Sequence, residues 1–272
     1  MTLRRFGAVA AAAVVALGLT ACGGGDGGDS GSGGGKFKVG IKFDQPGLGL
    51  KEGSDYTGLD VDVAKYIAKE LGHSEGDIQW VQAPSAQRET LISTGQVNMI
   101  VATYSITDKR KADVSFAGPY FIAGQDLLVR KDDSSITGKD ALKGKKVCSA
   151  TGSTPIQRIR DEKLTEDSNI VEFKTYSECV SQLLDKKVDA VTTDDAILKG
   201  YAAQNPEELK VVGQPFSTEK YGIGLPHDDK ALRTYVDDLL EKAFTDGTWQ
   251  KIYDGTLGKS GSAATPPTLE RY

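Results

Sequence analysis

The sequence predicts an α/β protein of two lobes, each built on a mainly parallel sheet flanked by helices. Three observations lead to this prediction. The 272-residue chain is 39% hydrophobic and 26% charged, which is typical of soluble globular proteins of one large or two small domains. Short apolar strands alternate with amphipathic helices between Lys36 and about Gly258, which implies parallel β-α-β units. The alternation occurs in two similar blocks, roughly 37–126 and 130–220.

Each block contains strand and helix patterns in the same order. The first block has predicted strands over 37–41, 78–81 and 99–101, and predicted helices over 59–71 and from a Ser85 cap to Ile92. The second has predicted strands over 146–148, 170–173 and 188–191, and predicted helices after Ser153 and from Ser177. Helices over 231–244 and 248–253 follow, and residues 259–272, with Ser, Gly and adjacent prolines, are expected to form a flexible tail.

Charge and residue counts exclude several classes of function. A net charge of −5 and a pI of about 5.2 argue against a nucleic-acid partner, because phosphate contacts need a basic surface. Two His and three Cys leave little material for a metal cluster or a His-dependent catalytic triad. The chain also has no nucleotide-binding P-loop motif. We therefore expect no metal and no cofactor.

The first residues read as a targeting segment. Arg4 and Arg5 precede an apolar run of about 14 residues, too short for a spanning helix, which needs about 20. The run ends in Leu-Thr-Ala-Cys at 19–22, which resembles a bacterial lipobox. We expect residues 1–21 to be removed and Cys22 to carry acyl chains, palmitate among them, that anchor the protein to a membrane. The alternatives are an ordinary signal peptide with a chance cysteine, or an uncleaved anchor.

A glycine-rich stretch follows Cys22. Residues 23–35 read GGGDGGDSGSGGG, a composition that cannot bury apolar surface and is typical of a flexible tether. Removal of the signal takes away two arginines and leaves 31 basic and 38 acidic residues, a net charge of −7. An acidic body is mildly repelled by an anionic lipid surface, which suits a protein held away from the membrane on a tether.

Hydroxyl groups and one arginine follow the predicted strand over 99–101. Thr103 and Ser105 come shortly after it, and Arg110 lies on a short helical turn beyond them. Open α/β sheets bind ligands at the carboxyl ends of their strands, where a guanidinium can hold a carboxylate through two hydrogen bonds. The alternative is a solvated basic turn, since lysines flank Arg110 on both sides.

Two further segments place polar groups after a strand. Asp194 and Asp195 follow the strand over 188–191; one carboxylate could bind an ammonium group and two could bind a metal ion. Alternatively, one of them only caps the next helix. Residues 150–154 also follow a strand and begin a helix, so their N–H groups and hydroxyls could bind an anion, or Ser153 is only a cap.

Five short motifs occur in an order that points to one family. They are GLDVDVA at 58–64, SITDKR at 105–110, FAGPY at 116–120, ATGS at 150–153 and VDAV at 188–191. Over about residues 36–258 the chain resembles the family-3, polar amino-acid-binding proteins of bacterial ABC importers, and most of all their actinobacterial glutamate-binding lipoproteins. This implies a type II periplasmic-binding-protein fold, with lobe 1 at 36–127 and 222–258 and lobe 2 at 128–221. Two crossing strands near 127–129 and 219–221 would form the hinge.

The resemblance assigns ligand-binding roles to residues at matching positions. One group would hold the α-carboxylate of an amino acid: the Arg110 side chain, Ser105 and the backbone of Thr151 and Gly152. Another would hold the α-ammonium: the Asp194 carboxylate and Thr103. Because these groups can bind any amino acid, selectivity must come from the pocket for the ligand's side chain.

Four residues would line that pocket. Ser85 and Arg88 have the spacing at which glutamate and aspartate binders of the family hold the distal carboxylate. Lys42 is a possible extra partner, and Tyr176 matches a pocket position where a His also occurs in relatives. The alternatives are a solvent-facing Arg88 paired with a neighbouring glutamate, and a Lys42 that is only an edge lysine.

Two cysteines, Cys148 and Cys179, remain beyond Cys22. Outside the cytoplasm a free pair would oxidise, so we predict a disulfide between a strand and a helix of the second block; the alternative is two thiols too far apart. The whole pattern predicts an extracytoplasmic, membrane-anchored monomer that captures glutamate, or else aspartate, and delivers it to an ABC permease. The alternatives are a binder or sensor of glutamine, asparagine or another polar amino acid. A less favoured one is a dehydratase-type enzyme using an acid or base such as Asp195.

Overall fold

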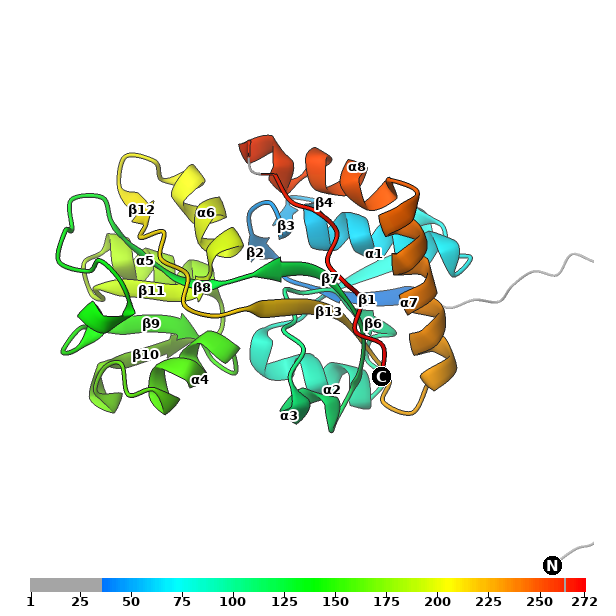
Figure 1. Ribbon diagram of the computed structural model, residues 1–272, viewed down its shortest axis with the longest axis horizontal. Helices are drawn as coiled ribbons and strands as arrows, with labels where there is room; N and C mark the ends of the chain where they lie inside the picture. The colour runs from blue at the N-terminus through cyan, green and yellow to red at the C-terminus, as the bar shows by residue number, and fades with distance from the viewer. Residues whose placement is uncertain (1–35, 262) are drawn as a thin grey trace, which may run out of the picture. The chain divides into compact units, whose positions relative to one another are not determined.

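Two five-stranded sheets form the framework of the protein in a computed structural model, which describes residues 36–261 and 263–272 (Figure 1). The first sheet contains, in spatial order, β5 (Ile78–Gln82), β1 (Phe37–Ile41), β6 (Met99–Ile100), β13 (Glu219–Leu225) and β7 (Ser115–Ala123). The second contains β10 (Ile170–Phe173), β9 (Val147–Ala150), β11 (Ala190–Asp194), β8 (Gln125–Arg130) and β12 (Leu209–Val211). The predicted signal peptide, the lipidation site Cys22 and the tether lie outside the described residues.

Each sheet is parallel over its first three strands, and one strand in each runs against its neighbours. That strand is β13 in the first sheet and β8 in the second. These two strands enter each sheet from the other one, which explains their reversed direction. The predicted α/β class and its two sheets flanked by helices are confirmed.

Helices pack against each sheet, and the main hydrophobic cluster contains buried residues of both, such as Ile41 of β1 and Val191 of β11. The first sheet carries α1 (Leu59–Glu70), α2 (Arg88–Ser93), α3 (Asp108–Lys111), α7 (Lys230–Thr245) and α8 (Thr248–Gly255). The second carries α4 (Thr154–Asp161), α5 (Tyr176–Leu184) and α6 (Asp195–Gln204). Short 3-10 turns are η1 (Glu75–Asp77), η2 (Ser85–Gln87), η3 (Lys139–Leu142), η4 (Asp167–Asn169) and η5 (Leu257–Ser260). We call the first sheet with its helices the first lobe, and the second sheet with its helices the second lobe.

A small antiparallel ribbon, which the sequence pattern did not predict, belongs to the first lobe. Its strands are β2 (Asp44–Gln45), β3 (Gly49–Glu52) and β4 (Asp55–Thr57). Strands of two to four residues are too short for an alternation of polar and apolar residues to be recognised. The ribbon begins three residues after β1 and therefore starts close to the carboxyl end of that strand.

Local sequence determines where several helices begin. The side chains of Thr107, Ser153, Thr175 and Asp229 accept hydrogen bonds from main-chain N–H groups in the first turns of α3, α4, α5 and α7. Each cap satisfies an N–H group that has no partner within the helix. Three of these helices, α3, α4 and α5, begin soon after the carboxyl ends of strands, so their first turns lie where a ligand would bind.

The chain crosses between the sheets twice. It passes from β7 to β8 through one residue, Gly124, and returns through residues 212–218 between β12 and β13. Figure 1 shows the two crossing paths side by side between the lobes. The predicted lobe limits at 127/128 and 221/222 stay a prediction; in the structure 127–129 pair in the second sheet and 219–221 in the first.

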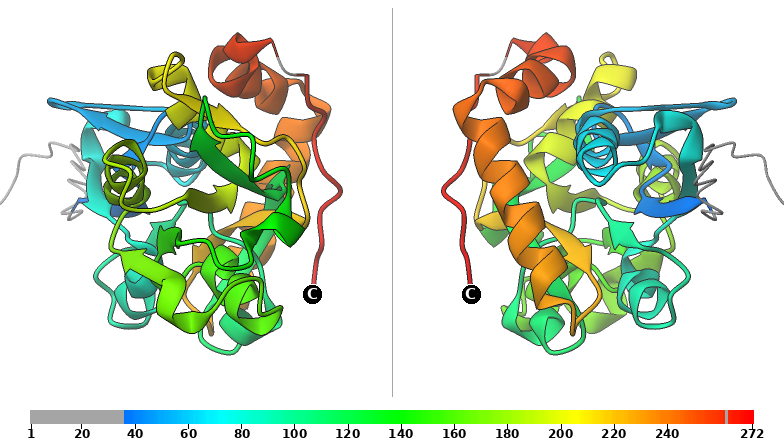
Figure 2. Two further views of the ribbon diagram at one scale, coloured as in Figure 1. Left: turned by 90° about the vertical axis from the view of Figure 1, so that its left-hand side faces the viewer. Right: turned by 90° about the vertical axis from the view of Figure 1, so that its right-hand side faces the viewer.

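The C-terminal segment contacts the first lobe, whereas its composition predicted a flexible tail. The Glu270 N–H donates to the Gly118 carbonyl at the free edge of β7 over 2.8 Å, and the Arg271 guanidinium pairs with Asp238 and Glu241 of α7. The Tyr272 hydroxyl accepts a hydrogen bond from the Phe116 N–H over 2.8 Å. Figure 2 shows this segment running alongside α7. Its partners are distant in sequence, so composition alone could not reveal them.

A disulfide joins Cys148 of β9 to Cys179 of α5, with the two Cα atoms 5.5 Å apart. The predicted pairing is therefore confirmed. The bond closes a loop with a sequence separation of 31 residues, which in the chain-entropy account stabilises the fold by about 3–4 kcal/mol. Within residues 36–261 and 263–272, every helix is too short or too polar to cross a membrane.

Candidate functional site

The candidate residues gather between the two sheets because each of the ten lies at or beyond the carboxyl end of a parallel strand. Lys42 follows β1; Ser85 and Arg88 follow β5; Thr103, Ser105 and Arg110 follow β6; Thr151 and Gly152 follow β9; Tyr176 follows β10; and Asp194 ends β11. Carboxyl ends of parallel strands share one edge of a sheet, so the two lobes bring their candidate residues to facing edges. Eight of the ten are buried, while Thr151 and Gly152 lie exposed at the rim.

Arg110 bridges the two lobes. Its guanidinium donates to the Ser105 carbonyl over 2.8 Å and to the Gly152 carbonyl of the second lobe over 3.1 Å. Its Nε lies 3.3 Å from a carboxylate oxygen of Glu89. The residue is 7% exposed, so the alternative of a solvated basic turn is wrong. Burial, together with the charge of Arg88, lowers the pKa of Arg110 to about 10.

Arg88 is also buried, at 2% exposure, so it does not face solvent. Its Nη1 donates to the main-chain carbonyls of Ala102 and Thr103 over 2.9 and 3.2 Å. Its guanidinium carbon lies 4.1 Å from the centre of the Tyr104 ring, a cation–π distance. The neighbouring glutamate, Glu89, pairs with Arg110 instead.

Lys42 completes a group of three buried cations. Its ammonium group donates to the Ser85 hydroxyl over 2.8 Å, and the residue is 4% exposed, so it is not an edge lysine. Burial and then the charge of Arg88 lower the pKa of Lys42 well below its usual range. The charges of Arg88 and Arg110 both contribute to the lowered pKa of Lys42, so these three side chains form a region of positive potential.

Asp194 supplies a carboxylate on the opposite lobe. One of its oxygens accepts from the Tyr221 hydroxyl over 2.6 Å, and the other, Oδ1, is buried with no hydrogen-bond partner among the described residues. It stands at the N-cap of α6, yet its side chain makes no capping hydrogen bond. Burial and the nearby charge of Glu219 raise the pKa of Asp194 to about 7. An ammonium group would satisfy the free oxygen.

Asp195 does not share this site. One of its oxygens accepts from the Gly124 N–H over 3.1 Å, and the other pairs with Lys199 at 2.6 Å. The two adjacent carboxylates therefore have separate partners and do not form a metal site together. More broadly, the described part of the chain has no group of three His, Cys, Asp or Glu side chains that could hold a metal ion.

The remaining candidates differ in whether their polar groups already have hydrogen-bond partners. The Ser105 hydroxyl lies 3.3 Å from the Thr154 hydroxyl of the second lobe, and Tyr176 is buried at the start of α5. The Thr151 N–H already donates to the Phe173 carbonyl of β10 over 2.9 Å. In this arrangement that backbone group is not free to bind a ligand, because strand pairing uses its donor.

The structure adds three residues that the sequence pattern did not single out. Gln45 is fully buried, and its Nε2 has no hydrogen-bond partner among the described residues. Tyr104 provides the ring beneath Arg88, and Asp60 accepts from the Thr103 N–H over 2.9 Å. Asp60 carried a readable signal, because a helical spacing places this charged residue on the apolar face of α1. Gln45 carried no such signal, because it belongs to the two-residue strand β2.

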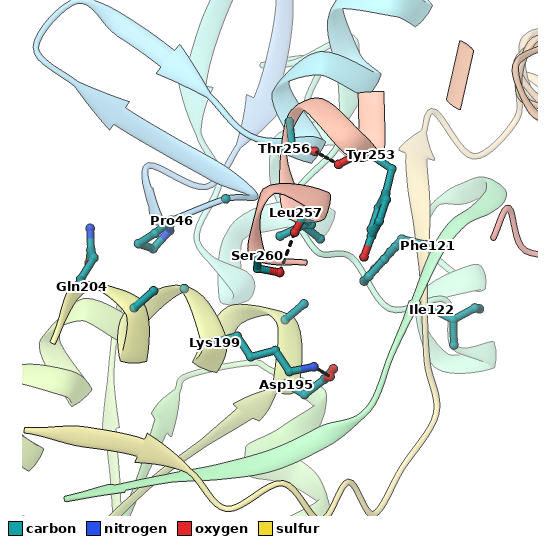
Figure 3. A pocket seen from close by; sticks show the side chains of 14 residues that line it. Pro46, Phe121, Ile122, Asp195, Lys199, Gln204, Tyr253, Thr256, Leu257 and Ser260 are labelled. Atoms are coloured by element: carbon teal, nitrogen blue, oxygen red, sulfur yellow. Dashed lines mark hydrogen bonds and ion pairs between the residues drawn. The ribbon is translucent and has the colours of Figure 1, made fainter. Parts of the chain in front are cut away.

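An apolar cavity of about 320 Å³ lies elsewhere between the lobes (Figure 3). Its walls come from α6, from the turn at Pro46, from β7 through Phe121 and from the region around Leu257. The ion pair of Asp195 and Lys199 lies at its side. None of the ten candidate residues lines it, so it is a separate feature of the lobe junction.

Comparisons with known proteins agree with the arrangement. A profile of the bacterial extracellular solute-binding proteins, family 3, matches residues 37–259. The glutamate-binding protein GluB of Corynebacterium efficiens is 42% identical over 98% of this chain and 95% of its own length. The ABC transporter glutamine-binding protein GlnH of Bacillus subtilis is 37% identical over 80% of each chain. A solved ancestral arginine-binding protein bound to glutamine has 34% identity and a TM-score of 0.76, covering 82% of this chain and 98% of that one.

Proposed function

The chain belongs to family 3 of the bacterial extracellular solute-binding proteins, and we propose that it captures glutamate first and aspartate next. Like its named relatives, it is a binding protein and not an enzyme. One observation carries the choice of an acidic ligand. Three basic residues, Lys42, Arg88 and Arg110, are buried close enough for the charges of both arginines to act on Lys42. The charge of Arg88 also acts on Asp194 of the second lobe, whose Oδ1 has no partner among the described residues.

Glutamate matches this charge pattern at three points. Its α-carboxylate would accept from Arg110 and the Ser105 hydroxyl, and its ammonium group would donate to Asp194. Its distal carboxylate would meet the Arg88 Nε, which is buried with no partner among the described residues, and Lys42. Burying cations without a counter-ion costs several kcal/mol, and a second carboxylate offsets that cost where a neutral amide does not. The relative GluB is named as glutamate-binding, which supports the same ligand.

Binding is tested by calorimetric titration of the mature protein with glutamate, aspartate, glutamine and arginine. Arg110→Ala should weaken every ligand by about a thousandfold, because it removes the partner of the shared α-carboxylate. Arg88→Ala should weaken glutamate by about 10- to 100-fold and glutamine much less, since only glutamate loses a charge-assisted hydrogen bond.

Arg233→Ala is the matched control, because Arg233 lies on α7 and contacts Tyr272 outside the site. Its affinity for glutamate should stay within about twofold of the wild type. Tight binding of glutamine or arginine with no binding of glutamate would reject an acidic ligand, while leaving an amino-acid-binding protein.

We further propose that lipid on Cys22 holds the protein at the outer face of the membrane, from which the loaded protein delivers its ligand to an ABC permease. The family is extracellular, and the relative GlnH is named as part of an ABC transporter. Cys22→Ser should move the protein from the membrane fraction into the medium, with ligand affinity unchanged. A membrane-bound Cys22→Ser variant would show that another element anchors the chain.

A further inference from the structure

Thr103 has a main-chain conformation that its side chain does not favour. Its φ angle is +45°, in the left-handed region, where a β-branched residue is crowded by its own backbone. Among the described residues only Lys163 and Lys186 share a positive φ without being glycine, and both are exposed residues just beyond a helix end. Thr103 is different, because it is buried and its carbonyl accepts a hydrogen bond from Arg88 of the candidate site. Something must stabilise this conformation.

The Asp60 carboxylate makes the contact that does so. Its Oδ2 accepts from the Thr103 N–H over 2.9 Å, and its Oδ1 accepts from the Tyr120 hydroxyl over 2.7 Å. Asp60 is completely buried in the first turn of α1, and Tyr120 is completely buried in β7. Both oxygens are therefore fixed by groups that cannot move independently of the sheet.

The main chain around Thr103 in turn holds both arginines. The carbonyls of Ala102 and Thr103 accept from Arg88 Nη1, and the Ser105 carbonyl accepts from Arg110 Nη1 over 2.8 Å. A rotation of the Thr103 backbone would turn these carbonyls away from the guanidinium groups. The direction of each guanidinium thus depends on the backbone angle that Asp60 stabilises.

We propose that Asp60 is a positioning residue of the amino-acid site, which aims Arg88 and Arg110 by holding the Thr103 backbone in its left-handed conformation. The inference rests on the proposed function, and it adds a residue that touches no ligand. Tyr120 belongs to the same device, because its hydroxyl orients the Asp60 carboxylate.

A simple charge effect predicts the opposite result. If Asp60 acted only through its negative charge, its removal would make the site more positive and tighten glutamate binding. If Asp60 only stabilised the fold, its loss would lower the fraction of protein able to bind, with no change in the Kd of the folded molecules. Calorimetry separates these cases, because it measures the stoichiometry and the Kd independently.

The test compares Asp60→Asn with Asp237→Asn by titration with glutamate and glutamine. Asp237 is the matched control: it is a buried carboxylate on α7 whose oxygen accepts from the Gly118 N–H over 2.8 Å, away from the site. We expect Asp60→Asn to raise the Kd for glutamate at least tenfold at unchanged stoichiometry and to reduce the preference for glutamate over glutamine. Asp237→Asn should leave the Kd within twofold of wild type. Tyr120→Phe, a milder change, should act in the same direction as Asp60→Asn.

A double-mutant cycle with Thr103→Gly tests the backbone directly. Glycine adopts a positive φ freely, so Asp60→Asn should cost at least threefold less affinity in the Thr103→Gly background than in the wild type. Equal costs in both backgrounds, tighter glutamate binding or a Kd unchanged by Asp60→Asn would overturn the inference. If the wild type binds glutamine and not glutamate, the proposed ligand fails, and the glutamine Kd decides the role of Asp60. A wild type that binds no amino acid would overturn both proposals.

Discussion

At the residue scale, the site combines charges that would be costly to bury separately. Lys42, Arg88 and Arg110 are all buried on the first lobe. Burial, and then the charge of Arg88, lower the pKa of Lys42 and of Arg110. Across from them Asp194 keeps one oxygen without a partner. A zwitterion with an extra carboxylate would supply a partner for each of these charges, which is the physical reason for the proposed preference for glutamate.

The titration of Asp194 predicts a pH dependence of ligand binding. Burial first, and then the charge of Glu219, raise its pKa to about 7, while the Tyr221 hydroxyl opposes this shift. The ammonium group binds the carboxylate form, so ligand binding releases the proton that Asp194 holds below pH 7. The Kd for glutamate should therefore rise roughly 10- to 30-fold between pH 7.5 and 5.5, measured by calorimetry in two buffers of different ionisation enthalpy.

Asp194→Asn provides the control, because it should bind weakly with little change of Kd over the same range. Burial raises the pKa of Asp60 to about 7 as well. If the Kd of Asp194→Asn for glutamate still depends on pH, the titrating group is therefore Asp60. The folding stability that Asp194 contributes depends on pH in the opposite direction to ligand binding. A raised pKa means that the unliganded folded state holds the proton more tightly, so this group favours folding at low pH and loses that contribution as the pH rises from about 4 to 7.

At the element scale, helices α5 and α6 of the second lobe meet the β2 strand of the first. The Asp44 carboxylate of β2 accepts from the Ser177 N–H in the first turn of α5 over 3.1 Å, and from the Tyr201 hydroxyl of α6 over 3.0 Å. The Tyr201 hydroxyl also donates to the Asp44 carbonyl over 2.5 Å. A carboxylate at a helix N-terminus is favoured by the helix dipole. This contact joins the lobes outside the ligand site.

We predict that Asp44→Ala weakens glutamate binding about three- to thirtyfold, although Asp44 is not among the ten candidate residues. Loss of the contact destabilises the closed arrangement of the lobes and leaves the open one unchanged, so the ligand must supply more of the closure free energy. Stopped-flow measurement should show a faster dissociation rate. Asp55→Ala, an exposed acidic residue of the same ribbon, is the control, and equal affinities of the two variants would contradict the prediction.

At the scale of the folded molecule, residues 36–261 and 263–272 form two lobes in contact across the candidate site. Arg110 reaches the Gly152 carbonyl, and a Cβ on Gly152 would lie 2.7 Å from the Ala86 Cα. On the side of the apolar cavity, a Cβ on Gly200 of α6 would lie 2.4 Å from the Pro46 carbonyl oxygen. Glycine at both positions allows the backbones of the two lobes to approach closely.

Gly200→Ala is therefore expected to oppose closure without touching the ligand. The added methyl group meets a main-chain oxygen, which cannot rotate away, so the glutamate Kd should rise about three- to tenfold. The free energy of unfolding without ligand should stay equal or rise by up to about 1 kcal/mol, because alanine favours a helix over glycine. Gly255→Ala in α8, where the methyl group meets open space, should leave the Kd unchanged. An unchanged Kd in Gly200→Ala would show that α6 shifts to accommodate it.

The sequence by itself determined the features that depend on neighbours along the chain. Alternating strand and helix patterns, the caps at Ser153 and the separation of two β/α blocks predicted the fold class, and the two cysteines predicted their disulfide. The positions of Arg110, Asp194 and Arg88 after strand ends were also readable, because the carboxyl end of a parallel strand is a local property. Their predicted ligand roles await the titrations described above.

Only the tertiary structure decided which residues meet. Asp60 lies 43 positions before Thr103, and Asp44 lies 157 positions before Tyr201, so no spacing along the chain relates them. The reversed strands β8 and β13, the ribbon at Gln45 and the docking of the C-terminal segment likewise depend on contacts between distant segments. Hydrogen bonds form between atoms about 3 Å apart in space, and which atoms reach that distance is settled by the packing of the two lobes as a whole.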